Sequence, residues 1–314
     1  MTYNLDMLPL YSDKYYEDYK INPLNSNKEL KRINIKYKDF NLVCYDSEVG
    51  DIILFLLNGG PGLPCNYLRD SHYEHLINKG IRIITYDQLG CGESSKPKDL
   101  SLWSIDRYVE ELEFVRNELN LGKLNLLGHS WGGWLAIEYS LKYKKNLNKL
   151  ILENTCGDMP HLISELNRLR EALGSETVKM MLKHEAEGTL DHPEYQAAIT
   201  ILNYRHVCRL DQWPAPLTRS LNDWNMDVYG TMQGPNEFLY IGNLKEWDRI
   251  NEMKEVDTPS LITVGMHDEL PPSCALKMHS ALPNSIIKVF KNSSHMPFYE
   301  EPDEYFKTLI NFIK

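Results

Sequence analysis

Hydrophobic and polar positions alternate along the chain in two different patterns. Residues 31–45 (KRINIKYKDFNLVCY) alternate with period two on both sides of a Lys-Asp pair, which predicts an antiparallel hairpin. Short apolar runs with turn residues close by follow further along, and such runs predict strands buried on both faces of a parallel sheet. The six runs are residues 52–57, 81–86, 124–127, 150–152, 261–264 and 286–290.

Segments between these runs have the spacing of helices. Residues 104–119 and 134–143 place apolar side chains at intervals of three and four, and the second segment follows a glycine pair. Strands that alternate with helices in this way predict a doubly wound α/β domain with a mostly parallel sheet.

The alternation stops between about residues 155 and 234, where helical patterns occur and no strand pattern is present. The helical stretches are 161–174, 175–188 and 192–210. We therefore expect a core of residues 1–154 and 235–314, interrupted by a helical cap at residues 155–234. The expected place of this cap is over the carboxyl ends of the strands, where open α/β sheets bind ligands.

Acidic residues outnumber basic residues by 44 to 34, which gives a formal net charge of −10. This charge disfavours nucleic-acid phosphates and anionic membranes as partners. The longest apolar run is far shorter than the roughly 18 residues that a membrane span needs, and the first twenty residues lack the features of a secretory signal. The sequence thus predicts a soluble, cytoplasmic protein that binds neither nucleic acid nor membrane.

The six cysteines are scattered, with no CxxC pair and no Cys/His grouping of metal-ligand spacing. Reduced thiols in a cytoplasm fit this distribution. No sequence feature indicates a metal ion or a cofactor, so we expect neither, and the sequence leaves the oligomeric state open.

The strongest chemical signal is the segment Gly128-His129-Ser130-Trp131-Gly132, which has the form G-x-S-x-G. It follows a predicted strand and precedes a predicted helix. In a nucleophile elbow the serine occupies a strained turn between strand and helix, so small residues are needed two positions before and after it. Ser130 is therefore the predicted nucleophile, and a glycine-rich packing turn is the alternative interpretation.

A serine hydroxyl needs a base and an orienting acid, which in this fold follow it in the order Ser, Asp or Glu, His. Asp268 and Glu269 follow the fifth apolar run, and His295 follows the sixth. We assign His295 as general base and Asp268 as its orienting acid, although either carboxylate could stand at the strand end. His129 is expected to pack rather than react, because its side chain should leave the elbow in another direction.

The segment Asn58-Gly59-Gly60-Pro61-Gly62 follows the first apolar run, and its glycines allow a backbone N–H group to approach a substrate closely. The N–H groups of Gly60 and Trp131 are predicted to form an oxyanion hole for a tetrahedral intermediate. A phosphate-binding loop is the rival interpretation, but both glycine-rich nucleotide signatures are absent and Pro61 removes a donor.

Four motifs together resemble the proline iminopeptidase family of α/β hydrolases, with the closest likeness to tricorn-interacting aminopeptidases. They are Asn58-Gly59-Gly60-Pro61-Gly62, Tyr86-Asp87-Gln88-Leu89-Gly90-Cys91-Gly92-Glu93-Ser94, Gly128-His129-Ser130-Trp131-Gly132-Gly133 and Gly234-Pro235-Asn236-Glu237-Phe238. The resemblance spans nearly the whole chain. It implies an α/β-hydrolase fold with an inserted helical cap, removal of single N-terminal residues, and a triad of Ser130, Asp268 and His295.

The resemblance also implies that Glu237 and Glu269 bind the free α-ammonium group of the substrate. Two carboxylates in a water-poor pocket recognise a compact cation through charge-assisted hydrogen bonds. One position departs from the family pattern, since relatives normally have histidine where Asn58 stands. Asn58 does not affect the backbone donors of the loop, but it replaces the side chain that supports this loop in relatives.

These residues predict a metal-independent serine aminopeptidase. It releases the N-terminal residue, proline or another and often hydrophobic one, from short peptides or aminoacyl substrates through an aminoacyl-enzyme. An amino-acid amide or ester hydrolase with the same triad is the alternative. The cap aromatics Tyr204, Trp213 and Trp224 could line a pocket for the first side chain, but we expect them to belong mainly to the core of the cap.

Overall fold

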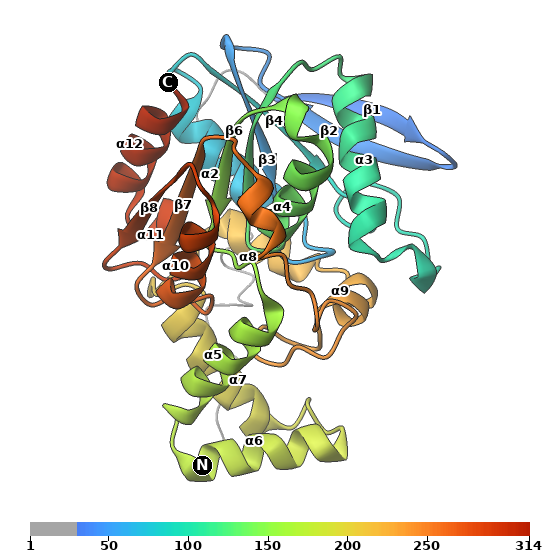
Figure 1. Cartoon of the computed structure of the whole chain (residues 1–314). Helices are drawn as coiled ribbons and strands as arrows, with labels where there is room; N and C mark the ends of the chain where they lie inside the picture. Colours follow the sequence, from blue (N-terminus) through green and yellow to red (C-terminus); the bar gives the residue numbers. More distant parts are fainter. Residues whose placement is uncertain (1–29) are drawn as a thin grey trace.

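The computed structural model describes residues 30–314 (Figure 1). Within this range eight strands form one sheet in the order β1-β2-β4-β3-β5-β6-β7-β8. The interpretation of the first twenty residues lies outside the described part of the chain. The strands are β1 Lys31–Tyr37, β2 Phe40–Asp46, β3 Ile52–Leu57, β4 Ile81–Asp87, β5 Leu124–His129, β6 Leu147–Glu153, β7 Ser260–Gly265 and β8 Ser285–Phe290.

The two antiparallel strand pairs lie at the edge of the sheet that β1 forms. β1 and β2 form the predicted hairpin, with Lys31 opposite Asp46 and Tyr37 opposite Phe40, and Lys38 in the turn has a φ of 53°. β2 then pairs antiparallel with β4, whereas every other neighbouring pair in this sheet is parallel. The prediction of a mostly parallel sheet is confirmed.

All six apolar runs are strands, but they are not equally buried. β3 begins and ends at the predicted residues, and β5 and β7 are buried along their whole length. β8 forms an edge of the sheet beside β7, and the side chain of Ile286 is 56% exposed. The prediction that residues 286–290 are buried on both faces is therefore wrong, because an apolar run does not reveal whether its strand has one neighbour or two.

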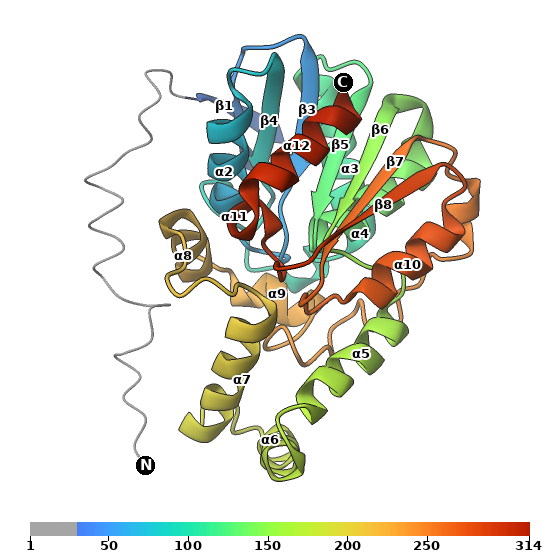
Figure 2. The same cartoon turned by 90° about the vertical axis from the view of Figure 1, so that its left-hand side faces the viewer.

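Helices cover both faces of the sheet (Figures 1 and 2). α2 (Asn66–Leu76) and α12 (Pro302–Ile313) lie on one face, and α3 (Ile105–Glu118) and α4 (Trp131–Tyr143) lie on the other. α10 (Pro272–Ala281) packs on β7 and β8. The predicted helix at 104–119 is confirmed as α3.

Five helices lie beyond the carboxyl-terminal edge of the parallel strands, below the sheet in Figure 2. The first three confirm the helical patterns at 161–174, 175–188 and 192–210, and the last two were not predicted because they are short. They are α5 Met159–Glu171, α6 Ser175–Glu187, α7 Pro193–His206, α8 Ala215–Asn222 and α9 Met226–Met232. Among residues 30–314, no helix combines the length and the apolar character that crossing a bilayer requires.

Candidate active site

Ser130 occupies the sharp turn between β5 and α4. Its backbone angles, φ 56° and ψ −122°, lie outside the regions that L residues normally adopt. The turn is held on both sides, since the N–H of Ser130 donates to the carbonyl of Glu153 at 2.9 Å and the carbonyl of Ser130 accepts from the Thr155 hydroxyl at 2.8 Å. Such strain persists where the surroundings fix it and is common at functional residues.

Two glycines make this turn sterically possible. A Cβ atom at Gly128 would lie 2.2 Å from the carbonyl oxygen of Gly132, and a Cβ atom at Gly132 would lie 2.2 Å from that of Leu57. The glycine pair also lies inside α4, which begins at Trp131 rather than at the predicted residue 134. The turn at Ser130 therefore requires glycine at both positions of the G-x-S-x-G pattern.

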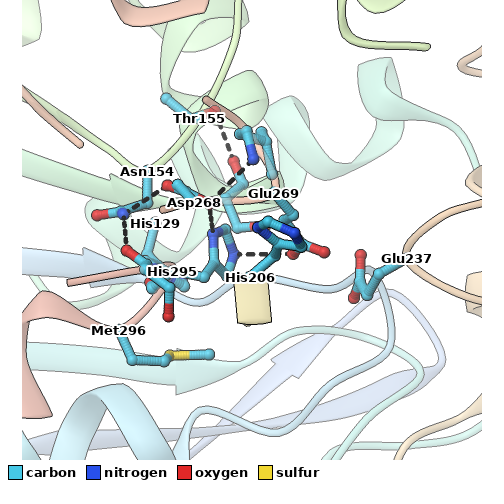
Figure 3. Close-up of polar contacts among 12 residues, drawn as sticks. His129, Asn154, Thr155, His206, Glu237, Asp268, Glu269, His295 and Met296 are labelled. Atoms are coloured by element: carbon cyan, nitrogen blue, oxygen red, sulfur yellow. Dashed lines mark hydrogen bonds and ion pairs between the residues drawn. The ribbon is translucent and has the colours of Figure 1, made fainter. Parts of the chain in front are cut away.

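Asp268 and His295 follow neighbouring strands and meet at their carboxyl ends. Nδ1 of His295 lies 2.7 Å from Oδ1 of Asp268 (Figure 3), and both side chains are almost fully buried. Burial by itself lowers the pKa of His295, but the charge of Asp268 and its hydrogen bond outweigh burial and raise that pKa above its usual value. The hydrogen bond fixes the tautomer that leaves Nε2 available as a base.

Asn154 completes the surroundings of this pair and was missed in the sequence. Its side-chain amide donates to Oδ2 of Asp268 at 2.6 Å and to the carbonyl of Ser294 at 3.0 Å. Its φ is 46°, a left-handed conformation that asparagine tolerates better than most residues. A lone asparagine after a strand gives no signal in the sequence, because the contact depends on a residue 114 positions away. We call Ser130, Asn154, Asp268 and His295 the catalytic floor.

His129 is buried beside the floor and has a structural role, as the sequence predicted. Its Nε2 lies 2.9 Å from the carbonyl oxygen of His295, and its Nδ1 lies 2.7 Å from the hydroxyl of Tyr67. Because a carbonyl only accepts, Nε2 carries the proton and Nδ1 accepts from Tyr67. Burial holds the pKa of His129 well below its usual value, so the ring stays neutral.

The predicted oxyanion donors belong to the loop after β3 and to the first residue of α4. The N–H of Gly59 donates to the hydroxyl of Tyr67 at 2.6 Å, which leaves Gly60 as the next donor of that loop. Trp131 is the first residue of α4, so its N–H has no partner within the helix. The two donors thus come from separate segments that meet at the elbow.

The side chain of Asn58 is buried in the same loop. Its amide donates to the carbonyl of Leu63 at 2.6 Å, and its Oδ1 accepts from Nε2 of Gln88 at 3.4 Å. Oε1 of Gln88 in turn accepts from the indole N–H of Trp131 at 2.9 Å. Asn58 therefore supports the loop through hydrogen bonds to its backbone, and Gln88 connects this loop with the elbow.

A cavity of about 450 Å³ lies between the floor and helices α7, α8 and α9, and Gly60, Ser130 and His295 line it. Trp213 and Trp224 line the cavity as well, while Tyr204 packs against Trp213 with ring centroids 5.4 Å apart. Six further side chains from this helical region that line the cavity are apolar or aromatic, namely Ile199, Val207, Leu217, Leu221, Met226 and Tyr229, and three are polar, namely Gln196, Asn203 and Asn222.

Two glutamates, which we call the acidic wall, adjoin the floor. Glu237 lines the cavity and accepts a hydrogen bond from Nε2 of Gln233 at 2.7 Å. Glu269 is 1% exposed, and no residue in the described range donates a hydrogen bond to its carboxylate oxygens. Its Oε1 lies 3.5 Å from Nε2 of His295, close enough for an ion pair but too poorly placed for a hydrogen bond.

Burial is the main electrostatic influence on the acidic wall. Burial raises the pKa of Glu237, and it raises the pKa of Glu269 well above the usual range. The negative charges of Glu237 and Asp268 raise the pKa of Glu269 further. Burial also raises the pKa of Glu153, at the end of β6, to about 8. Negative charge is therefore already costly at this end of the sheet, and an incoming cation would be favoured.

Comparisons with known proteins agree with this geometry. Residues 52–302 match the alpha/beta hydrolase fold family. The proline iminopeptidase of Saccharolobus solfataricus is 37% identical over 94% of this chain and 94% of its own, and that of Thermoplasma volcanium is 37% identical over 83% and 88%. The crystal structure of VinJ superimposes with a TM-score of 0.85 and 30% identity over 90% of this chain and 98% of VinJ.

The chain belongs to the proline iminopeptidase family of α/β hydrolases. The crystal structure of the proline iminopeptidase of Mycobacterium smegmatis superimposes on this chain with a TM-score of 0.82 and 30% identity. The match covers 90% of this chain and 97% of the Mycobacterium protein. The family resemblance and the α/β-hydrolase fold predicted from the sequence are confirmed.

One group of metal-ligating residue types occurs among the described residues of this family member. Atoms of His184, His192 and Glu194 lie within 4.8 Å of one another, a group that the sequence did not reveal. The two imidazole rings stack with centroids 4.4 Å apart and planes 20° apart, and both ring nitrogens of His184 already lie within hydrogen-bond distance of Thr189 and Glu194. None of the three lines the cavity.

Proposed function

We propose that this protein is a serine aminopeptidase that releases an N-terminal proline, or another apolar residue, from short peptides. The observation that carries the proposal is the arrangement of the cavity. The strained Ser130, His295 and Glu237 line it, and the buried Asp268 and Glu269 lie behind His295. The names of the relatives agree with the aminopeptidase activity predicted from the sequence.

Attack by Ser130 begins the proposed reaction. Nε2 of His295 accepts the proton of the Ser130 hydroxyl while Oγ attacks the carbonyl carbon of the first residue. The Asp268 carboxylate stabilises the imidazolium that forms, because it already accepts the hydrogen bond of Nδ1 at 2.7 Å. The N–H groups of Gly60 and Trp131 donate to the oxyanion of the tetrahedral intermediate.

Cleavage and hydrolysis complete the cycle. His295 gives its proton to the departing amine, which leaves an aminoacyl ester on Ser130. A water molecule then attacks this ester with His295 again as the base, and the free amino acid and Ser130 are regenerated.

Recognition of the substrate rests on the acidic wall and on the apolar part of the cavity. Glu237 and Glu269 hold the α-ammonium group, and the cap side chains contact the first side chain. A volume of about 450 Å³ accommodates one or a few residues, so short peptides enter and folded chains do not. We propose that residues 155–234 act as the cap over a core of 1–154 and 235–314.

The proposal is tested with aminoacyl p-nitroanilides of Pro, Ala, Leu and Phe, together with N-acetyl-Pro p-nitroanilide. We expect turnover of the free amino-terminal substrates, with Pro among the best, and loss of at least about 10⁴-fold in kcat for Ser130→Ala. Full activity of Ser130→Ala, or equal turnover of the acetylated substrate, contradicts the proposal. Prolinamide, proline methyl ester and Pro-Gly compared by kcat/KM separate the peptidase from the amide or ester hydrolase.

A further inference from the structure

Glu269 occupies an unusual place, because its carboxylate faces the atom that must act as the base. Its Oε1 lies 3.5 Å from Nε2 of His295, on the side of the ring opposite the hydrogen bond to Asp268 (Figure 3). The side chain is 1% exposed, and the backbone is fixed by a hydrogen bond from the N–H of Glu269 to the carbonyl of His206 at 3.2 Å.

The hydrogen bonds around the three neighbouring carboxylates are unequal. Asp268 accepts from Nδ1 of His295, from Asn154 and from the N–H of Leu270, and Glu237 accepts from Gln233. Glu269 accepts from no group in residues 30–314. An ionised carboxylate in this condition is very costly to bury, so it either binds a proton or faces a cation.

Few titratable groups around Glu269 could share a proton with its carboxylate. Burial raises the pKa values of Tyr229 and Tyr240, whose hydroxyl groups interact with Glu237, well above their usual range, so both remain neutral. Burial lowers the pKa of His206, whose Nδ1 already lies 2.8 Å from the carbonyl of His267. The remaining groups that face Glu269 are Asp268, Glu237 and His295.

We propose that the resting enzyme holds one proton between Glu269 and Nε2 of His295, and that the α-ammonium group of the substrate displaces this proton. The proposal rests on the aminopeptidase function. Before binding, the proton blocks the lone pair of Nε2. The ammonium group then donates its N–H bonds to the Glu269 carboxylate, the proton leaves to solvent, and the lone pair of Nε2 becomes free to accept the proton of Ser130.

This exchange balances in charge and in bonds. One O–H or N–H bond of the Glu269–His295 pair breaks, one proton enters the solvent, and one cation takes the place of the other. A substrate with a blocked amino group therefore fails twice, because it neither binds the acidic wall nor frees the base. Recognition of the amino terminus and activation of the nucleophile become a single event.

Substitutions of Glu269 test the exchange on p-nitrophenyl acetate, a neutral ester with no amino group. In Glu269→Ala the base is free from the start, so we expect the burst of nitrophenolate at pH 7 to be about tenfold faster than in the wild type. Glu269→Gln retains an amide that can donate toward Nε2, so its burst should stay at or below the wild-type rate. Ser130→Ala supplies the background rate.

An Ala variant that acylates no faster than the wild type, or a Gln variant as fast as the Ala variant, overturns the proposal. Near-ultraviolet circular dichroism and thermal melting establish that both variants are folded. The pH profile of the burst adds a reading that a merely structural role would not change. Its acid limb should move to lower pH in Glu269→Ala, because Nε2 no longer shares a proton.

Calorimetry tests the exchange directly, first with Glu269 in place and then with Glu269→Gln. Prolinamide is bound to the Ser130→Ala protein at pH 6.5 in phosphate and in Tris, whose ionisation enthalpies differ. We expect release of about one proton per ligand and loss of that release when Glu269→Gln is added. No release, or release that survives Glu269→Gln, overturns the proposal.

The two proposals can fail separately. Turnover of aminoacyl anilides without acceleration of the ester burst in Glu269→Ala removes the exchange and leaves the aminopeptidase. Absence of any aminoacyl turnover removes the aminopeptidase function whatever the ester burst shows.

Discussion

The catalytic floor and the acidic wall lie side by side, yet they differ in how their polar atoms are paired. Every carboxylate oxygen of Asp268 has a donor in the protein, and the strained turn at Ser130 is held by Glu153 and Thr155. Glu269, the next residue in the chain, has no hydrogen-bond donor among the described residues. In the proposed function Asp268 positions His295 with its donors already in place, whereas Glu269 obtains its donors from the ligand.

The difference has an energetic meaning. Preorganised hydrogen bonds cost nothing at the moment of reaction, so the floor can stabilise charge as soon as it develops. A buried carboxylate without a partner is costly, and in the proposed function the ammonium group of the substrate removes this cost on binding. In the proposed function the floor therefore serves the rate of the reaction, and the wall serves the choice of substrate.

Asp268→Asn should have the largest effect, because it breaks the pairing of the floor. The asparagine amide can donate to Nδ1 of His295 and so favours the wrong tautomer, in which Nε2 carries the proton. We expect kcat for Pro p-nitroanilide to fall about 10⁴-fold with the fold intact. The exposed Asp303→Asn, at the start of α12, is the control. A loss below tenfold in Asp268→Asn would remove Asp268 from its assigned role as the orienting acid.

Glu237→Gln should have a smaller effect, confined to the wall. The amide keeps the volume of the side chain but removes the charge that faces the ammonium group. We expect kcat/KM for Pro p-nitroanilide to fall about 10- to 100-fold, mainly through KM, which corresponds to one lost charge-assisted hydrogen bond. The exposed Glu246→Gln is the control. An unchanged KM for Glu237→Gln would remove this residue from substrate binding.

The pH profile should show the smallest effect and connects the two regions. His295 must be neutral to accept a proton, and its pKa is raised, so kcat/KM should fall about tenfold per pH unit below that raised pKa. The charge of Glu237 contributes to this rise. The acid limb should therefore move to lower pH in Glu237→Gln. A limb that stays in place would show that wall and floor titrate independently.

Much of the floor was predictable because its signals are local. The elbow at Ser130 requires glycines at fixed positions, and Asp268 and His295 each follow an apolar run that is long enough to identify a strand. The carboxyl ends of parallel strands meet at one edge of a sheet, so order along the chain was enough to bring these residues together. Asn154 follows the end of β6 in the same way, but asparagine after a strand is too common to stand out.

The edge strand and the cap show where sequence patterns stop being informative. Residues 286–290 have the same apolar pattern as the buried strands, and only the strand order places β8 at the edge of the sheet. α8 and α9 are too short to produce a clear helical period. His184, His192 and Glu194 are gathered by the turn between α6 and α7 and by the packing of these helices, which spacing alone does not specify.

The sequence by itself determined the mostly parallel sheet, the triad candidates and their order, because periodicity and tight turns are properties of neighbouring residues. Only the tertiary structure decided how the carboxylates differ. Asp268 and Glu269 are adjacent and chemically alike, yet one faces Nδ1 of His295 and Asn154 while the other faces Nε2 with no donor of its own. Burial and hydrogen bonding depend on residues far away in the chain, and these contacts make the surroundings of the two carboxylates different.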